Sequence, residues 1–326
     1  MKDRSRRDFM KFGGMALGLG TLYTVAPGLR SSALGRAFGE HTKDKNGEAV
    51  KPFTFLQLSD SHVGFSGPPD PLGTAAFERA VEVVNGMAER PDLVLFTGDL
   101  THDTEDKDQH AQRMQKFKEI AGRIKVDKTF YVPGEHDAGL DGGVLFREHF
   151  GETHYSFDHK GVHFVALDNV SQAKPQVGSE QMEWLKRDLA RFPKTAPIVV
   201  FTHRPLFDLR PDWEWFTSDG DDVMNVLSPF EHVTVLYGHI HRDDEHEEGH
   251  VKHYGARSLI FAFPDPEKVN GVKKPIAFDK DKPFQNLGIR SVAARGGDLD
   301  VKDVELTLRE YSGVNGLQQL SKAVNL

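Results

Sequence analysis

Histidine and carboxylate side chains recur in five short segments, each of which follows an apolar run. The segments are Asp60-Ser61-His62, Gly98-Asp99, Gly134-Glu135-His136-Asp137, Thr202-His203 and Gly238-His239-Ile240-His241. Apolar runs such as Leu93–Phe96 predict buried strands, and ligands bind where the loops after such strands converge. The sequence has no cysteine, so any metal bound here must be held by imidazole nitrogens and carboxylate oxygens. We therefore expect one metal-binding site at the carboxyl ends of the strands.

The order of the five segments is more specific than any one of them. Written D-x-H, G-D, G-E-H-D, T-H and G-H-x-H, it resembles the calcineurin-like metallophosphoesterase superfamily over the stretch from Phe53 to His241. The third segment departs from the family, which usually has Asn where this chain has Glu135. The resemblance implies an enzyme, a dinuclear metal-dependent hydrolase of phosphoric esters.

The same resemblance implies a role for each polar residue of the segments. Asp99 would bridge two transition-metal ions, and imidazole and carboxylate ligands suit iron, manganese or zinc. The other implied ligands are Asp60, His62 and His241 for one ion and Glu135, His203 and His239 for the second. A hydroxide that bridges the ions would attack the phosphorus atom. His136, oriented by Asp137, would help the leaving group to depart.

Glu135 changes the charge that such a centre would carry. An ionised Glu135 removes one unit of positive charge relative to Asn, which weakens the attraction of a phosphate dianion. Either a trivalent ion such as Fe(III) restores the charge, or the centre works best on phosphodiesters, which carry one negative charge instead of two. The alternative is a Glu135 side chain that points away from the metals.

The elements that must position these residues alternate between strand and helix. Strands are predicted over Phe53–Leu58, Leu93–Phe96, Thr129–Val132, Tyr155–Phe157, Val162–Ala166, Ile198–Phe201 and Val233–Leu236, with further strands between Val251 and Leu308. Amphipathic helices are predicted over Ala75–Arg90, through Met114, Phe117, Ile120 and Ile124, and from Ser179 onward. This alternation suits the fold that the resemblance implies, a four-layer αββα sandwich of the α/β class in which two mixed sheets are flanked by helices.

The N-terminal segment resembles an export signal. Ser5-Arg6-Arg7-Asp8-Phe9-Met10-Lys11 is similar to the twin-arginine signal S-R-R-x-F-L-K, and a glycine-rich apolar stretch follows it. We therefore divide the chain into a signal segment, residues 1–37, a polar linker, residues 38–51, and one catalytic domain, residues 52–326. The resemblance implies the twin-arginine export machinery as a partner and a periplasmic location, with a membrane tether if the signal is not cleaved.

Charge and family resemblance together limit the substrate. The formal net charge of -8 argues against a surface for nucleic acid or anionic membranes. The resemblance implies a small phosphomono- or phosphodiester as substrate. Two other functions stay open: a metal-binding protein on the same scaffold with little or no turnover, and a dinuclear hydrolase of another ester or anhydride.

Several conspicuous residues have a plain structural interpretation. We expect His102, like the histidines outside the five segments, to be structural, and the acidic run Asp243–Glu248 to be a solvated loop. Trp213, Trp215 and Phe216 lie shortly after His203, and they form a specificity wall of the site or pack in the core or in a dimer interface.

Overall fold

The structure, a computed structural model, describes residues 45–269, 271–295 and 298–306. The predicted signal segment, residues 1–37, and the first part of the predicted linker lie outside the described residues. At the start of the described chain, Val50 is buried and the Lys51 N–H donates to the Lys160 carbonyl at 3.1 Å. Among the described residues, no helix is both long enough and apolar enough to cross a bilayer.

Two sheets carry the site. The first has the strand order β11-β10-β1-β2-β3. In it, β1, β2 and β3 pair in parallel, whereas β10 pairs antiparallel with both β1 and β11. Its strands are β1 (Phe53–Leu58), β2 (Leu93–Thr97), β3 (Thr129–Val132), β10 (Gly288–Arg295) and β11 (Asp298–Glu305). Because β1, β2 and β3 run in parallel, the segments after them emerge at the same edge of the sheet.

The second sheet has the order β4-β5-β6-β7-β9-β8, with an antiparallel pair at each end and parallel strands between. Its strands are β4 (Tyr155–His159), β5 (Val162–Ala166), β6 (Pro197–Phe201), β7 (His232–Tyr237), β8 (Asp244–Glu248) and β9 (Val251–Gly255). The parallel pair β6 and β7 delivers the fourth and fifth polar segments at one edge.

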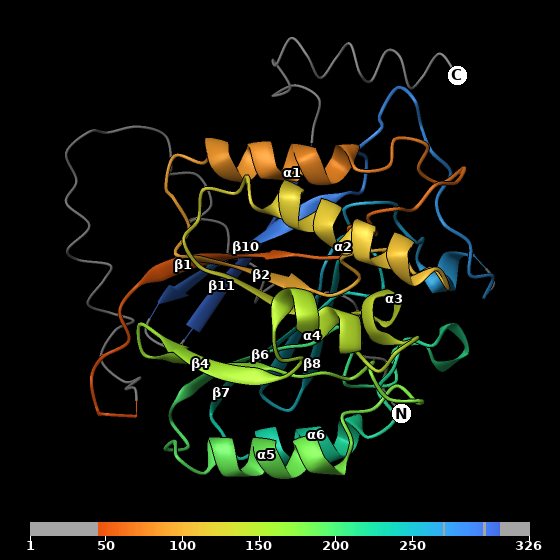
Figure 1. The fold of residues 1–326 in the computed structure, drawn as a ribbon. Coiled ribbons are helices and arrows are strands. Elements are labelled where there is room, and N and C mark those ends of the chain that lie inside the picture. Colours follow the sequence, from red (N-terminus) through yellow and green to blue (C-terminus); the bar gives the residue numbers. More distant parts are fainter. Residues whose placement is uncertain (1–44, 270, 296–297, 307–326) are drawn as a thin grey trace, which may run out of the picture. The chain divides into compact units, whose positions relative to one another are not determined.

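Helices cover the outer face of each sheet, as Figure 1 shows for α1 and α2 on one side and α5 and α6 on the other. The helices are α1 (Ala75–Gly86), α2 (Lys107–Ala121), α3 (Glu135–Ala138), α4 (Val144–Phe150), α5 (Ser179–Leu189) and α6 (Gly220–Leu227). Two short 3₁₀ turns, η1 (Pro211–Trp213) and η2 (Pro266–Lys268), lie in the later loops. The predicted class, two mixed sheets flanked by helices, is confirmed.

The alternation of side chains along each strand explains the layers. In β1, Leu56 and Leu58 pack against α1 and α2, whereas Phe53 and Phe55 pack between the two sheets. A strand exposes successive side chains on opposite faces, so one apolar run can fill two cores. The strands of the second sheet do the same, with one row toward α5 and α6 and the other toward the first sheet.

Three local predictions differ from the structure or are decided by it. Helix α1 ends at Gly86, short of the predicted Arg90. The acidic run predicted to be a loop forms β8, a largely exposed edge strand, and its charges discourage pairing with another chain. Trp213 and Trp215 are 2% and 0% exposed and belong to a packed cluster with Tyr237, so they are core residues.

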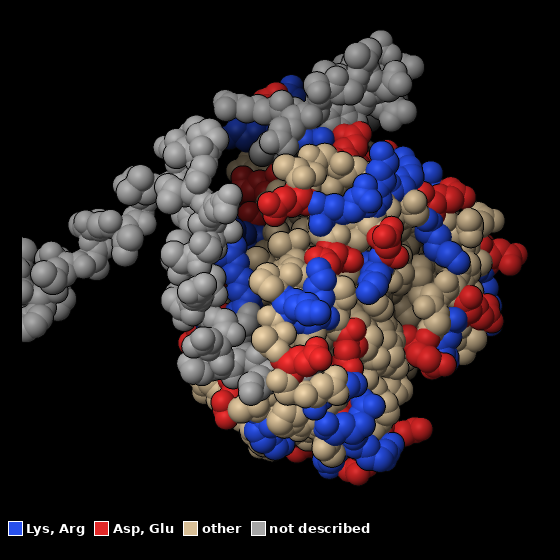
Figure 2. All heavy atoms as spheres, turned by 90° about the vertical axis from the view of Figure 1, so that its left-hand side faces the viewer, with Lys and Arg blue, Asp and Glu red and all other residues tan. Residues whose placement is uncertain are grey.

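Surface charge is mixed on the face seen in Figure 2. Lys and Arg side chains alternate there with Asp and Glu over the part of the surface that the structure describes. Ion pairs such as Lys45 with Asp158 (2.6 Å) and Arg123 with Glu78 (3.1 Å) join opposite charges at exposed or partly exposed positions. Exposed pairs of this kind contribute little to stability, about 0–1 kcal/mol each.

A buried carboxyl group in the loop before α1 predicts a stability that depends on pH. Asp70 accepts a hydrogen bond from Leu72 N–H (2.8 Å), but burial raises its pKa from 3.8 to about 7. The folded state therefore holds a proton that the unfolded chain releases. The contribution of the protonated Asp70 to the free energy of unfolding is fully present below pH 3.8 and is lost as the pH rises through about 7. Asp70→Asn should leave stability unchanged near pH 4 and raise it by ~1–3 kcal/mol near pH 8. Urea unfolding at both pH values checks this, and equal stabilisation at both would contradict it.

Candidate metal centre

The five polar segments meet where the two sheets come together. In the loops that follow β1 and β2, the Asp60 N–H donates to the Gly98 carbonyl at 3.0 Å. In the loops that follow β6 and β7, the Gly238 N–H donates to the His203 carbonyl at 2.9 Å. The His239 N–H donates to the Asp60 carboxylate at 3.0 Å, which joins the two sheets directly. The loops are thus fixed to one another by hydrogen bonds before any ligand is considered.

Backbone strain is concentrated in these loops. Among the residues that the structure describes, those other than glycine with positive φ are Asp60, His62, Asp99, Lys160, Glu214, His239, His241 and Asn286, and five of these eight are predicted metal ligands. Left-handed backbone is unfavourable for residues with a Cβ atom, and it clusters at functional sites where the surrounding structure enforces it. The strain therefore marks the predicted ligands independently of their chemistry.

Two glycines allow the loops to approach so closely. A Cβ atom on Gly98 would lie 2.3 Å from His203 Nδ1, and Gly98 itself has φ +91°. A Cβ atom on Gly238 would lie 2.6 Å from the Asp60 carboxylate. Any larger residue at either position would displace a predicted ligand.

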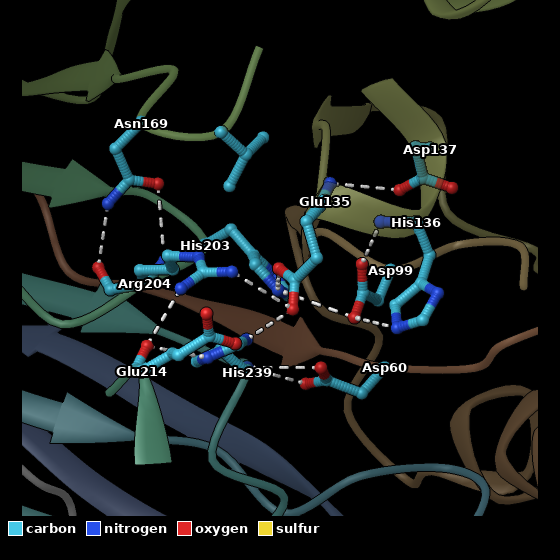
Figure 3. A network of polar contacts seen from close by, with 12 residues as sticks. Asp60, Asp99, Glu135, His136, Asp137, Asn169, His203, Arg204, Glu214 and His239 are labelled. Carbon is cyan, nitrogen blue, oxygen red and sulfur yellow. Dashed lines mark hydrogen bonds and ion pairs between the residues drawn. The ribbon is translucent and has the colours of Figure 1, made fainter. Parts of the chain in front are cut away.

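The predicted ligands form two groups that share one carboxylate. Asp60, His62, Asp99 and His241 make the first group, and Asp99, Glu135, His203 and His239 make the second. Within each group, the ligand atoms lie within 4.8 Å of one another. Asp99 Oδ2 lies 3.3 Å from His62 Nε2 and 3.4 Å from His203 Nε2, so it faces both groups. Figure 3 shows Asp99 beside Glu135, with dashed lines from its carboxylate to His203 and His136.

Backbone carbonyls fix which nitrogen of each imidazole faces the centre. His203 Nδ1 donates to the Thr97 carbonyl (2.7 Å), and His241 Nδ1 donates to the Phe261 carbonyl (2.8 Å). His239 is reversed, because its Nε2 donates to the Glu214 carbonyl (3.1 Å). Each ring in its neutral form therefore directs one lone pair at the centre, from Nε2 in His203, Nε2 in His241 and Nδ1 in His239. Hydrogen bonds of this kind orient metal-binding histidines.

The donor atoms fit metal ions because imidazole nitrogens and carboxylate oxygens from several loops converge at short distances. Glu135 Oε2 and His203 Nε2 are buried 2.8 Å apart, and neither has a hydrogen-bond partner among the described residues. His62 Nε2 and His241 Nε2 lie 3.1 Å apart in the first group. Lone pairs that converge at such distances repel unless a proton or a metal ion lies between them. The chemistry of the set, imidazole and carboxylate, suits transition metals.

The electrostatics of the second group favour positive charge. Burial lowers the pKa of His203, but Asp99 and Glu135 raise it well above its usual value. Burial and Glu135 raise the pKa of Asp99, yet His203, His136 and His62 hold it well below its usual value. Side chains that stabilise a buried positive charge on an imidazole would stabilise a metal ion in the same place.

The predicted partner of His136 is wrong. His136 Nδ1 contacts the carboxylate of Asp103, a residue from the loop after β2. The Asp137 carboxylate faces the interior instead, where it accepts hydrogen bonds from the N–H groups of Leu100 (2.9 Å) and Thr101 (2.8 Å). Successive side chains of a helical turn point about 100° apart, so a residue adjacent to His136 in α3 cannot face the same way. Asp137 holds the loops together, and Asp103 orients His136.

His136 itself lies at the open side of the centre. Its Nε2 is 4.0 Å from Asp99 Oδ2, and its side chain is 28% exposed. Burial lowers its pKa, but Asp99, Asp103 and Glu135 raise it to about 9. The imidazole is thus placed to hold a proton beside the centre and within reach of solvent.

Glu135 points into the centre, which excludes the alternative that it points away. Its carboxylate lies 2.8 Å from His203 Nε2 and 2.8 Å from His239 Nδ1. Burial raises the pKa of Glu135, but His239, His203 and Arg204 hold it well below its usual value. The chain therefore has an ionised carboxylate at the position where an amide was expected from the family pattern.

Asp103 and Arg204 were not among the predicted site residues, and His102 was predicted to be structural. His102 Nδ1 lies 3.3 Å from His62 Nδ1. One ring nitrogen each from His62, His102 and His136 form a third group of close ligand atoms. Asp103 and Arg204 each stand close to a predicted ligand in sequence, Asp103 four residues after Asp99 and Arg204 directly after His203. That proximity was the available signal, but it gave no indication of the direction in which the side chains point.

Proteins of one family resemble this chain. Residues 53–243 match the family described as calcineurin-like phosphoesterase. A 3',5'-cyclic-nucleotide phosphodiesterase of Nostoc is 24% identical over 221 residues, which are 65% of this chain and 80% of that protein. A serine/threonine-protein phosphatase of Danio rerio is 26% identical over 235 residues, 64% of this chain and 76% of that protein.

Solved structures share the fold at low sequence identity. The crystal structure of a dimetal phosphatase from Danio rerio superposes with a TM-score of 0.53 and 14% identity, covering 78% of this chain and 99% of that chain. At this level of identity, the likeness concerns the arrangement of sheets and helices alone.

Proposed function

The chain belongs to the calcineurin-like phosphoesterase family, and from this premise we propose that it hydrolyses a small phosphomono- or phosphodiester outside the cytoplasm. It is a dinuclear metal-dependent phosphoric ester hydrolase. The relatives act, by their names, on a cyclic phosphodiester and on phosphoproteins, so both ester classes are represented among them. A cyclic nucleotide is the diester to test first.

The observation that carries this proposal is the sharing of Asp99 by two groups of ligand atoms. Asp60, His62 and His241 would hold one ion with Asp99, and Glu135, His203 and His239 would hold the other. Two bound metal ions supply a nucleophile from water at neutral pH and neutralise charge on the phosphoryl oxygens. Asp99 fixes the two sites relative to each other, because its Oδ1 accepts the His136 N–H (3.0 Å) while Oδ2 faces both groups.

His136 and Asp103 would assist the leaving group. Asp103 engages His136 Nδ1 and so directs Nε2 toward the centre. A proton held on that nitrogen can pass to the departing alkoxide oxygen, which otherwise leaves as an unstable anion. The contact with Asp103 keeps the imidazole in the orientation and protonation state that this transfer needs.

Product formation from a panel of phosphate compounds tests the proposal, measured as inorganic phosphate for monoesters and pyrophosphate and as the monoester product for diesters. The panel should contain cyclic nucleotides, nucleoside monophosphates, glycerophosphodiesters and a pyrophosphate, each assayed with metal-loaded and metal-stripped protein. Hydrolysis of at least one ester that disappears on stripping and returns with metal supports the proposal. Two bound metals per chain without turnover on any ester would support the metal-binding alternative, and hydrolysis confined to pyrophosphate would support the anhydride alternative.

Export by the twin-arginine route is part of the proposal, and it rests on the sequence around Arg6 and Arg7, outside the described residues. Replacing both arginines by lysine should retain the protein in the cytoplasm, because the export machinery recognises the arginine pair while the charge stays the same. Cell fractionation with an antibody to the protein measures this. An unchanged periplasmic fraction in the double variant would contradict the twin-arginine interpretation. N-terminal sequencing of the mature protein decides whether the segment is cleaved.

A further inference from the structure

Glu135 poses an electrostatic problem for a phosphoesterase, and this inference therefore rests on the proposed function. Together, Asp60, Asp99 and Glu135 place three carboxylates around the two predicted metal sites. Each additional negative charge strengthens the binding of metal cations and weakens the binding of a phosphoryl anion at the same place. A positive charge beside Glu135 would offset this loss of affinity for phosphoryl anions.

Arg204 is next to Glu135 in the structure. Its Nη2 atom lies 3.5 Å from Glu135 Oε1, and the two side chains are 10% and 25% exposed. Figure 3 shows the guanidinium on the side of Glu135 away from Asp99, with His203 and His239 around the same carboxylate. At this burial the charges are poorly screened by water, so each strongly affects its surroundings.

The structure holds Arg204 in place from both ends. The Asn169 side chain accepts a hydrogen bond from the backbone N–H of Arg204 (3.2 Å) and donates one to the backbone carbonyl of Arg204 (2.9 Å). At the other end, Arg204 Nη1 donates to the Glu214 carbonyl at 2.7 Å. That same carbonyl accepts a hydrogen bond from His239, and Glu214 has a left-handed backbone with φ 61°. Such a network positions the charge permanently, unlike a mobile surface ion pair.

We propose that Arg204 compensates the negative charge of Glu135 and thereby maintains the affinity of the metal-loaded centre for phosphoryl anions. The pair Glu135–Arg204 then carries the same net charge as the neutral amide usual in the family. The trivalent ion and the preference for diesters that Glu135 suggested in the sequence both assumed an uncompensated charge. With Arg204 in place, a divalent pair and a monoester dianion are compatible with the centre.

A charge-compensating role predicts opposite effects on two ligands. Removing the positive charge in Arg204→Gln makes the centre more negative, so metal ions should bind as tightly as before or more tightly, and phosphate more weakly. Removing the negative charge in Glu135→Asn should have the reverse effect on both. A residue that only holds the loops together would weaken metal and phosphate binding in parallel, because both require the same geometry.

Calorimetric titration of the full chain measures the two affinities separately. Mn²⁺ is titrated into metal-stripped protein, and inorganic phosphate is then titrated into protein loaded with Mn²⁺. The variants are Arg204→Gln, Arg204→Lys, Glu135→Asn and the double variant Glu135→Asn with Arg204→Gln. Arg187→Gln is the matched control, since it removes the same charge from an exposed position on α5.

We expect Arg204→Gln to weaken phosphate binding by about tenfold without weakening Mn²⁺ binding. The affinities of Arg204→Lys and Arg187→Gln for both ligands should stay within about threefold of the wild type. The phosphate affinity of the double variant should do the same, because its residues 135 and 204 together are again neutral. Parallel weakening of both ligands in Arg204→Gln, or no change in either, would overturn the inference. If Arg204→Gln does not fold, the double variant compared with Glu135→Asn measures the same loss of charge. Failure of the wild type to bind any of Mn²⁺, Zn²⁺ and Fe²⁺ would instead contradict the proposed function.

Discussion

Replacing Asp99 by alanine should abolish phosphoesterase activity and reduce the metal content below two ions per chain. Asp99 is 1% exposed, and its carboxylate faces both groups of ligand atoms, so one substitution removes a ligand from each. Losing the several kcal/mol of stabilisation that metals give a phosphoryl transition state corresponds to about 10³-fold or more in rate. Turnover of the best ester of the panel, together with elemental analysis of the same sample, measures both effects.

The same variant should lose the stabilisation that metal binding confers. At free metal about 100 times above the dissociation constant, a single site adds ~2.7 kcal/mol to the free energy of unfolding. We expect the melting temperature of the wild type to rise on addition of metal and that of Asp99→Ala to stay nearly constant. Asp127→Ala is the control, since it removes an exposed carboxylate just before β3, at the opposite end of that strand from the centre. Two bound ions and full activity in Asp99→Ala would refute the shared-carboxylate interpretation.

Replacing His136 by alanine should slow the hydrolysis of esters with poor leaving groups far more than that of nitrophenyl esters. A nitrophenolate ion is stable enough to leave without a proton, whereas an alkoxide is not. The expected loss is about 10²–10⁴-fold for alkyl esters, which is the usual contribution of general acid catalysis. The measurement is the turnover of wild type and variant on a series of esters that differ in the pKa of the leaving alcohol. Equal losses across that series would make His136 a binding or structural residue.

Variants at Asp103 and Asp137 distinguish a carboxylate that orients His136 from one that stabilises the loops. Asp103→Asn should give the same dependence on the leaving group as His136→Ala, with a smaller loss, because the imidazole remains but loses its carboxylate partner. Asp137→Asn should lower stability and leave the dependence on the leaving group unchanged, because Asp137 supports Leu100, Thr101 and Gly134. A leaving-group effect in Asp137→Asn without one in Asp103→Asn would contradict the corrected assignment.

The identity and order of the polar segments were readable in the sequence, and so was the class of fold. Apolar runs that end in Asp60, Asp99 and His203 predict buried strands with polar loops, and the strands and family are confirmed by the structure and by comparison. This information is local, because the period of a strand and the residue that follows it depend on neighbours along the chain. The roles of individual residues as ligands stay predictions until metal content is measured.

The partners of the site residues were decided only by the tertiary structure. Asp137 follows His136 in sequence but faces the interior, while Asp103 reaches His136 from another strand. Arg204 meets Glu135 because β6 and β3, strands of different sheets, end at the same place. No sequence pattern specifies such contacts, since they depend on the packing of two sheets and on the direction of each side chain.

The tautomers of the histidines were decided in the same way. The carbonyls that orient His203, His239 and His241 belong to residues 106, 25 and 20 positions away in the chain. A backbone carbonyl is present at every residue, so its identity carries no signal that a sequence could reveal. Residue types therefore established which chemistry is available, and the folded backbone determined which nitrogen and which charge face the centre.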